Sequence, residues 1–585
     1  MPDVYMRASR YLILIALISL VACSDATRSA TTATTPITNS LPTTTPEKGP
    51  SIEAVAANTT TIANYDLAEF TVDVEATYDN PFDQREVTLD ASFVHEDGTA
   101  FSIPGFWDGD ENWKVRFTPT EPGDWTYQMV VTDASGTSEP ALGSLTVTSS
   151  DHPGFLRIGD QVDPDYSPRY FAYEDGTPWY GRGHADLDMS LGGADPSGDG
   201  LRKFSEMAED GENYEMWWPM WGNNFIQSTY ASYSPAQLEI IDFVMADAEA
   251  KDIAIIFTIW GHQFLRSGAH AWGDDRWGFN GFNDLTDLED FFTDPEAWAW
   301  QENLYRYVIA RWAYSPALIM WQTVTEINGT ESYENTDIWH EKVNAYFQDN
   351  DPYRHLTTAT KSGAEDWPEG HASMDVPQVH IYHIFSENPI ADTVHFVEWT
   401  QLMWDREVKP NWAGEYGNEA QVSYPEFMHN ANWGSLVAGA ALTPTEWNDK
   451  RAFGTFDEAM QRDMRRFADF VETVPLVAYG PERVEVASSD PEVRGWGLAG
   501  ERGGILWVQD FALDDATMAE IRADETVRSG VIVTVDSLSA GTWTVTPFDT
   551  WTGDWLDALV VACPGGTCHI SLPDFHADMA LHLER

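Results

Sequence analysis

The chain has 585 residues with 94 acidic and 33 basic side chains, which gives a formal net charge of −61 at neutral pH. A surface this acidic repels phosphate backbones, so the composition excludes nucleic acid as a partner. Aromatic residues make up 13% of the chain and include 26 Trp. Their flat faces suit stacking on sugar rings, although core packing is the expected role of most of them.

Residues 1–23 have the features of an export signal. Arg7 and Arg10 precede the apolar run 11–22, which is too short to span a bilayer comfortably and therefore predicts a signal peptide. The tetrad LVAC that ends at Cys23 resembles a bacterial lipobox, whose cysteine is lipidated after cleavage. The resemblance implies a protein anchored to a membrane by lipid alone and working outside the cytoplasm. An ordinary signal peptide is the alternative.

The next two segments differ sharply in composition. Residues 24–50 are mostly Thr, Ser, Ala and Pro and predict a disordered linker. Residues 51–152 alternate apolar and polar side chains, as in "FTVDVEATY" and "VTLDASFVH", with Gly and Pro between the runs. This pattern predicts an N-terminal β-sandwich.

A group of residues within 103–127 is specific enough to compare with a known family. The group consists of Pro104, Gly105, Phe106, Trp113, Arg116, Phe117, Pro119 and residues 123–125. The segment resembles a small β-sandwich domain that precedes the barrel in many bacterial glycoside hydrolases. The resemblance implies that the domain after this β-sandwich acts on carbohydrate, but it assigns no catalytic residue to the β-sandwich itself.

Residues 153–475 alternate strand-like apolar runs with helical patterns. One helix is expected to begin with Ser234 as its cap, Pro235 at its first position and Gln237 completing a capping box. The run "DIAIIFTIWGH" follows this helix and predicts a buried strand. The residues expected at strand ends are His184, Trp217, Trp260, Glu326, Thr360, Tyr382, Glu415 and Trp447.

Eight parallel strands with helices between them predict an α/β fold, the (β/α)₈ TIM barrel. A doubly wound open sheet is the competing architecture, and the sequence has no Gly-rich phosphate loop to support it. Residues 476–585 return to alternation and predict a C-terminal β-sandwich. In this last part Cys563 and Cys568 flank the turn "PGGT", where they can close a disulfide in an oxidising compartment; two reduced thiols are the alternative.

Two glutamates are expected at the carboxyl ends of barrel strands, where active sites of this fold lie. Glu326 follows the fourth strand in "ALIMWQTVTEING", and Glu415 ends the seventh in "KPNWAGEYGNEA". Cleavage of a glycosidic bond requires two carboxyl groups, one to protonate the leaving oxygen and one to attack or to activate water. A separation of about 5–5.5 Å lets the second group attack directly and retains the anomeric configuration.

The segment 294–329 is similar to the one that precedes the acid/base glutamate in clan A glycoside hydrolases. If the roles of the two catalytic glutamates of that clan are carried over to this chain, Glu326 is the acid/base and Glu415 is the nucleophile. The resemblance implies a retaining hydrolase that cleaves β-linked plant or algal polysaccharide. The clan commonly has Asn before the acid/base, whereas this chain has Thr325, which points to a different sugar in the cleavage subsite. Asn328 is the candidate substitute.

Further substrate-binding candidates lie at the expected strand ends. Tyr382, with His380 as alternate, is expected near the nucleophile, and Trp447 is expected to form a floor under the sugar. Arg182 has a guanidinium that suits Glu415 or a carboxylate or sulfate of the substrate. The remaining candidates are His184, Trp217, Trp260 and His262, for which a role in the core is the alternative.

The sequence predicts neither a metal nor a cofactor, because it contains no HExxH motif and no Cys/His ligand spacing. Two other functions stay open. A carbohydrate-binding lipoprotein without catalytic activity would fit Thr325, and a polysaccharide lyase would fit Arg182 as the group that neutralises a uronic acid. Neither alternative explains the two glutamates.

Overall fold

The computed structural model describes residues 49–109, 112–185, 200–219, 226–268, 275–331, 335–382, 386, 388–417, 424–447 and 456–585. The described residues belong to one unit, Gly49–Arg585. The predicted signal peptide, the lipidation site Cys23 and residues 24–48 of the predicted linker lie outside the described residues.

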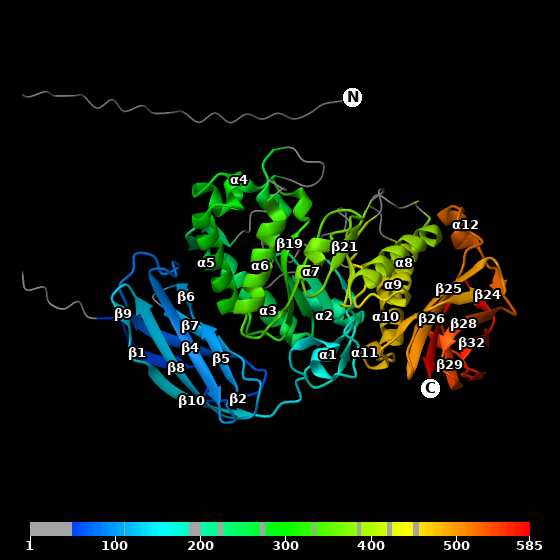
Figure 1. The fold of residues 1–585 in the computed structure, drawn as a ribbon, viewed down its shortest axis with the longest axis horizontal. Coiled ribbons are helices and arrows are strands. Elements are labelled where there is room, and N and C mark those ends of the chain that lie inside the picture. The colour runs from blue at the N-terminus through cyan, green and yellow to red at the C-terminus, as the bar shows by residue number, and fades with distance from the viewer. Residues whose placement is uncertain are drawn as a thin grey trace, which may run out of the picture. The chain divides into compact units, whose positions relative to one another are not determined.

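Two sheets form the N-terminal part of this unit, drawn in blue in Figure 1. One sheet has the order β1 (Ser51–Ala57), β3 (Ala68–Glu75), β7 (Asn112–Phe117) and β6 (Phe106–Gly109). The other has the order β2 (Thr61–Ala63), β10 (Ala141–Thr148), β8 (Gly123–Asp133), β4 (Val87–His95) and β5 (Ala100–Pro104), with β9 (Gly136–Thr137) beside β8. Alternate residues of β4 are buried, and Phe93 of this strand stacks on Phe117 of the first sheet at 3.9 Å. The alternation predicted for these strands is confirmed.

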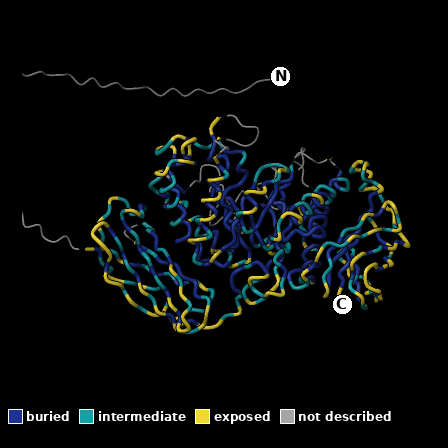
Figure 2. The backbone as a smooth tube through the Cα atoms, viewed as in Figure 1, coloured by how far each residue is buried: buried dark blue, intermediate teal, exposed yellow. Residues whose placement is uncertain are grey.

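A five-stranded parallel sheet follows in the middle of the chain. Its order is β14 (Gly183–His184), β15 (Tyr214–Trp217), β18 (Ala254–Gly261), β19 (Leu318–Thr325) and β20 (Leu356–Ala359). Every residue of β18 and β19 is buried, which explains why their sequences are mostly apolar. Figure 2 shows the same concentration of buried residues in the middle of the unit. β21 (Gln378–Ile381) and β22 (Trp412–Tyr416) form a second parallel pair.

The two parallel groups are linked on both sides. On one side, the backbone N–H of Val376 donates to the carbonyl of Thr357 in β20 at 3.0 Å. On the other side, Leu442 makes a parallel bridge with Gly181, and Glu446 makes one with Tyr416. The residues before Trp447, which were expected to form an eighth strand, therefore pair through isolated bridges. The other seven strands end within one residue of the predicted positions.

Helices separate the parallel strands along the chain. They are α2 (Gly200–Glu209), α3 (Pro235–Ala250), α4 (Leu288–Phe291), α5 (Pro295–Trp312), α6 (Thr336–Asn350), α7 (Pro368–Ser373), α8 (Pro389–Arg406), α9 (Pro425–Ala438) and α10 (Glu458–Val471). α3 starts at Pro235 as predicted, but the side chain of Ser234 makes no capping hydrogen bond, so the predicted capping box is wrong. None of the helices in the described ranges combines the length and the apolar character needed to cross a membrane.

Short elements complete the middle region. They are α1 (Gly159–Val162), α11 (Leu476–Tyr479), the sheet of β11 (Leu156–Ile158), β12 (Phe171–Tyr173) and β13 (Pro178–Trp179), the hairpin of β16 (Gln227–Thr229) and β17 (Ser232–Tyr233), and the 3₁₀ helices η2 (His262–Leu265), η3 (Trp277–Phe279), η4 (Gly281–Asp284) and η5 (Ile327–Gly329). Two of them, η2 and η5, directly follow β18 and β19 at their carboxyl ends.

The C-terminal part contains mainly antiparallel sheets. The largest has the order β23 (Glu482–Val484), β25 (Val493–Ala499), β26 (Gly503–Asp510), β34 (Asp578–Glu584), β29 (Gly541–Asp549) and β30 (Asp554–Trp555), with β31 (Leu559–Cys563) beside β29. The others are β24 (Val486–Ser488), β28 (Ile532–Leu538) and β32 (Gly566–Ser571), and the pair β27 (Val527–Arg528) and β33 (Phe575–His576); α12 (Met518–Ala523) lies between β26 and β27 in sequence. Cys563 and Cys568 form a disulfide in this part.

Candidate active site

Glu326 directly follows β19 and has an unusual backbone conformation. Its φ and ψ are both 52°, in the left-handed region that a residue with a Cβ rarely occupies. The chain turns here from the extended strand into η5. The sharp turn places a carboxylate at the carboxyl end of a fully buried parallel strand, where the residue is only 5% exposed.

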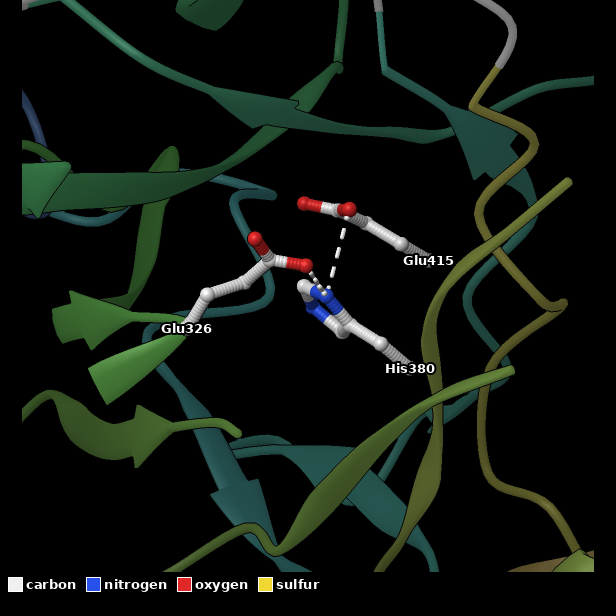
Figure 3. Close-up of side chains that lie close together, drawn as sticks. All are labelled: Glu326, His380 and Glu415. Carbon is white, nitrogen blue, oxygen red and sulfur yellow. Dashed lines mark hydrogen bonds and ion pairs between the residues drawn. The ribbon is translucent and has the colours of Figure 1, made fainter. Parts of the chain in front are cut away.

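Glu326, His380 and Glu415 point toward one another (Figure 3). His380 Nδ1 lies 3.0 Å from Glu326 Oε1 and 3.2 Å from Glu415 Oε2. His380 and Glu415 are register partners on β21 and β22, which explains why their side chains meet. The ligand atoms of the three residues all lie within 4.8 Å of one another. The two glutamates that the sequence singled out are therefore neighbours in space.

Two further predicted residues contact this cluster. The hydroxyl of Tyr382, directly after β21, donates a hydrogen bond to Glu415 Oε2 at 3.0 Å. His262, the first residue of η2, has its Nε2 3.5 Å from Glu326 Oε2. The two carboxylates thus have different polar partners, a phenol beside Glu415 and a second imidazole beside Glu326.

The electrostatics of the cluster follow from its burial. Glu415 is 3% exposed and His380 is fully buried, so little water screens the two carboxylates. Two ionised carboxylates this close repel each other, and the arrangement favours a state in which the pair holds a proton or faces a cation. This is the chemistry that a proton donor beside a nucleophile requires.

Aromatic rings lie next to the cluster. The ring centroids of Trp218 and Trp447 are 5.0 Å apart, and Trp218 lies 6.4 Å from the His262 ring in an edge-on arrangement. Trp447 was predicted at the site, but Trp218 was not. It directly follows β15, and because neighbouring strand residues point to opposite faces, the sequence "WW" at 217–218 did not decide which of the two rings lies at the site.

Trp217 and Trp260, predicted as substrate-binding candidates, have the alternative role in the core. Both rings are fully buried, and stacking requires an exposed face. Trp217 packs edge-on against Phe257 of β18 at 5.8 Å. Trp260 donates its indole N–H to the hydroxyl of Tyr305 on α5 at 2.8 Å. Both indoles therefore belong to the layer between the parallel sheet and its helices.

Arg182 and His184 have partners outside the cluster. Arg182 forms an ion pair with Glu472 at 2.9 Å and donates to the carbonyl of Gly211, so its predicted pairing with Glu415 is wrong. Burial lowers the pKa of Arg182 despite the Glu472 carboxylate. His184 Nδ1 lies 2.5 Å from Glu212 Oε2, with both side chains buried. The structure gives both residues roles within the protein.

Asn328 does not replace the missing asparagine before Glu326. Its side chain lies in η5 and holds the neighbouring loop: it accepts from the backbone N–H of Ser362 at 2.7 Å and donates to Glu365 at 3.2 Å. The hydroxyl of Thr325 is fully buried and makes no hydrogen bond within the described residues. The residue before the candidate acid/base therefore supplies a buried hydroxyl where the resembled clan has an amide.

Comparisons with known proteins bear on the fold. Residues 61–132 match a family model described as a domain of unknown function, DUF5060. A search of curated proteins finds no match. A crystal structure of a proposed glycoside hydrolase from Bacteroides vulgatus is 15% identical and has a TM-score of 0.63, covering 90% of this chain and 100% of its own.

Two other solved structures are less similar. A glycoside hydrolase family 5 protein from Bacteroides vulgatus has a TM-score of 0.49 at 14% identity, covering 74% of this chain and 94% of its own. An endo-β-1,4-mannanase from Thermotoga petrophila has a TM-score of 0.41 at 14% identity, covering 68% of this chain and 92% of its own. Only the similarity to the first structure is high enough to carry an argument. It shows that this mixed α/β chain shares its fold with a proposed glycoside hydrolase.

Proposed function

We propose that this chain is a retaining glycoside hydrolase that cleaves β-linked polysaccharide by double displacement. The observation that carries the proposal is the meeting of Glu326 and Glu415, whose ligand oxygens lie within 4.8 Å of each other. Retaining enzymes hold their two carboxyl groups about 5–5.5 Å apart, whereas inverting enzymes separate them by about 6.5–9.5 Å to admit a water. The observed spacing supports direct attack by one carboxylate.

The site would lie in a (β/α)₈ barrel of the clan A type. The parallel sheet β14 to β20, the pair β21–β22 and the bridges at Leu442 and Glu446 are what such a closed barrel would contain. Glu326 and Glu415 sit at the carboxyl ends of what would be its fourth and seventh strands. Active sites of this fold lie at that end, which supports their assignment.

In the proposed mechanism, Glu415 attacks the anomeric carbon while Glu326 protonates the leaving oxygen. Glu326 then removes a proton from the water that hydrolyses the glycosyl-enzyme. The Tyr382 hydroxyl would orient the nucleophile through its 3.0 Å hydrogen bond. Trp447, which is half-buried and packs against the buried Trp218 at 5.0 Å, would provide the flat surface on which a sugar ring stacks.

The remaining parts of the proposal concern the surroundings of the barrel. Residues 51–152 and 476–585 would be the flanking β-sandwiches, and residues 153–475 the catalytic barrel. Cys23 would carry the lipid that holds the protein outside the cytoplasm, on a bacterial membrane. The substrate would be a plant or algal polysaccharide, supported by the aromatic content of the chain.

The test is the release of new reducing ends from a panel of plant and algal polysaccharides by the full-length protein. We expect one polymer to be cut and both Glu326→Gln and Glu415→Gln to lose at least about a hundredfold in kcat, as removal of a general acid or nucleophile does. Glu458→Gln, whose side chain is 91% exposed and pairs with Arg462 on α10, is the control and should keep its activity. Activity that survives both substitutions would show that the catalytic pair is wrong. Binding without cleavage would favour a carbohydrate-binding protein, and unsaturated products a lyase.

A further inference from the structure

The cluster of Glu326, His380 and Glu415 brings two carboxylates and one imidazole together in a buried site. His380 Nδ1 lies within 3.2 Å of an oxygen of each carboxylate. A neutral imidazole has one N–H, directed along one line, and cannot give a full hydrogen bond to both oxygens. All three residues are at most 5% exposed, so little water competes for these donor atoms.

The two distances from His380 Nδ1 match the spacing of neighbouring metal ligands, and the two carboxylate oxygens lie within 4.8 Å of each other. Zinc binds imidazole nitrogen and carboxylate oxygen at about 2.0–2.2 Å, which separates neighbouring ligand atoms by about 3.0 Å in an octahedron and about 3.4 Å in a tetrahedron. The two distances from His380 Nδ1, 3.0 and 3.2 Å, fall in this range. A divalent cation would also neutralise both carboxylates at once.

The chemistry of the donors selects a class of metal. One imidazole nitrogen with two carboxylate oxygens favours Zn²⁺ and Co²⁺ over Mg²⁺ and Ca²⁺, which prefer oxygen ligands alone. His262 Nε2 lies 3.5 Å from the second oxygen of Glu326 and adds another imidazole to the neighbourhood. Cysteine thiolates are absent from the described cluster, so copper(I) is disfavoured.

We propose that Glu326, His380 and Glu415 bind one divalent transition metal such as Zn²⁺, and that the bound metal blocks the site. The inhibitory part rests on the proposed function, because the metal would occupy the carboxylates that hydrolysis uses. Binding and hydrolysis would exclude each other. The metal is therefore a reversible inhibitor that competes with substrate, and catalysis does not require it.

The test measures metal binding without substrate. Zn²⁺ is titrated calorimetrically into the full-length protein at about 0.5 M NaCl, where weak binding to exposed acids is screened, and Co²⁺ is followed by its visible absorption. We expect one saturable site per chain. Glu326→Gln, His380→Gln and Glu415→Gln should each weaken binding at least about tenfold, since even outer-shell partners of a metal contribute that much.

Two control variants should bind Zn²⁺ as the wild type does. Glu458→Gln removes a carboxylate that is 91% exposed, and His355→Gln breaks a buried pair with Asp351 that has the same chemistry but one carboxylate only. Near-ultraviolet circular dichroism establishes that each variant is folded. Absence of a saturable site in the wild type, or retention of that site in all three cluster variants, would overturn the proposal.

Kinetics test the inhibitory part separately. With a polysaccharide that the enzyme cuts, Zn²⁺ should raise the apparent KM and leave kcat unchanged. Stimulation by Zn²⁺, or tight binding without inhibition, would contradict a site formed by the catalytic pair. Because binding is measured without substrate, a protein that cuts no polysaccharide would refute the proposed function while the binding result stands on its own.

Discussion

At the residue scale, Glu326 shows how the site is set by backbone geometry. A residue with a Cβ in the left-handed region costs about 1–2 kcal/mol, and Glu326 has φ 52° directly after β19. The turn is held by the backbone N–H of Ile327, which donates to the carbonyl of Thr360 at 2.9 Å. Strained residues cluster at functional sites, and they persist only where the surrounding structure is rigid enough to hold them.

Tyr382→Phe tests whether the phenol orients the proposed nucleophile. The substitution removes the 3.0 Å hydrogen bond to Glu415 Oε2 and keeps the ring. A hydrogen bond to a charged group contributes about 1.5–3 kcal/mol, so kcat should fall about ten- to a hundredfold, with KM changing less. Tyr166→Phe, which loses a hydrogen bond to the carbonyl of Gly176 away from the cluster, is the control. Equal kcat values for Tyr382→Phe and the wild type would show that Glu415 is oriented without the phenol.

The roles of individual aromatic residues could not be predicted from the sequence. Trp217 and Trp218 are adjacent and chemically identical, yet one packs against Phe257 and the other lies beside Trp447. A strand's period distinguishes two faces but does not say which face lines the site. The catalytic candidates could be predicted because a carboxylate at the end of an apolar run is rare. A tryptophan there is ordinary core material.

At the element scale, the strands were the most predictable part. Seven of the expected strand ends lie within one residue of the observed ones, and the clearest signals came from β18 and β19, which are buried on both faces and mostly apolar. The segment before Trp447 failed to form a regular strand, although it pairs at Leu442 and Glu446. Side-chain contacts between elements, such as the pairing of Arg182 with Glu472, depend on tertiary packing and leave no local sequence signal.

One such contact ties strand β7 to helices α3 and α5. Asp242 on α3 accepts hydrogen bonds from Arg116 on β7 and from Arg311 and Trp312 on α5, at distances of 2.6–3.1 Å. Burial raises the pKa of Asp242, but the guanidiniums of Arg116 and Arg311 outweigh this and hold it below its ordinary value. The carboxylate is therefore ionised and neutralises two buried cations.

Asp242→Asn should destabilise the protein strongly. The two guanidiniums are at most 7% exposed as side chains and would lose their shared carboxylate. Breaking a buried ion pair costs about 3–5 kcal/mol, and we expect about 3 kcal/mol because Glu69 and Asp108 remain as partners. Urea unfolding gives the free energy of unfolding directly.

The matched control is Asp90→Asn. Asp90 on β4 pairs with Arg306 on α5, but its side chain is 43% exposed. An exposed pair contributes about 0–1 kcal/mol, so the same chemical change should have little effect here. Comparable losses in the two variants would mean that burial does not determine the contribution of these ion pairs.

At the scale of the whole molecule, basic residues are scarce: the chain has 33 basic residues and 94 acidic ones. Several of the few cations sit where segments distant in sequence meet. Arg116 and Arg311 join N-terminal strands to helices, and His429 on α9 joins α10 to β34. In a chain with this much repulsion between acidic residues, a cation stabilises the fold most where that cation neutralises two carboxylates at once.

His429 carries the clearest consequence of this arrangement. It is fully buried, with Nδ1 2.8 Å from Asp463 and Nε2 3.1 Å from Asp578, and its ring stacks on Trp551 at 4.0 Å. Burial would lower the pKa of His429, but the two carboxylates raise it from 6.5 to about 10. The imidazolium therefore connects two carboxylates that lie far from it in sequence. Asp463 is 34 positions away and Asp578 is 149 positions away.

The raised pKa predicts how stability depends on pH. Between pH 6.5 and about 10 the folded chain holds a proton on His429 that the unfolded chain has lost. The stabilisation is therefore fully present below pH 6.5 and is lost as the pH rises through about 10. Within that window this proton makes the free energy of unfolding fall by up to about 1.4 kcal/mol per pH unit.

The measurement is urea unfolding of the wild type and of His429→Gln between pH 6 and pH 11. Other groups titrate in this range in both proteins, so the informative quantity is the difference between their free energies of unfolding. That difference should be largest near pH 6 and shrink by a few kcal/mol toward pH 10, as the imidazolium loses its proton. A variant that stays folded with a difference independent of pH would show that His429 is neutral in the native protein and that packing against Trp551, and not charge, holds these segments together.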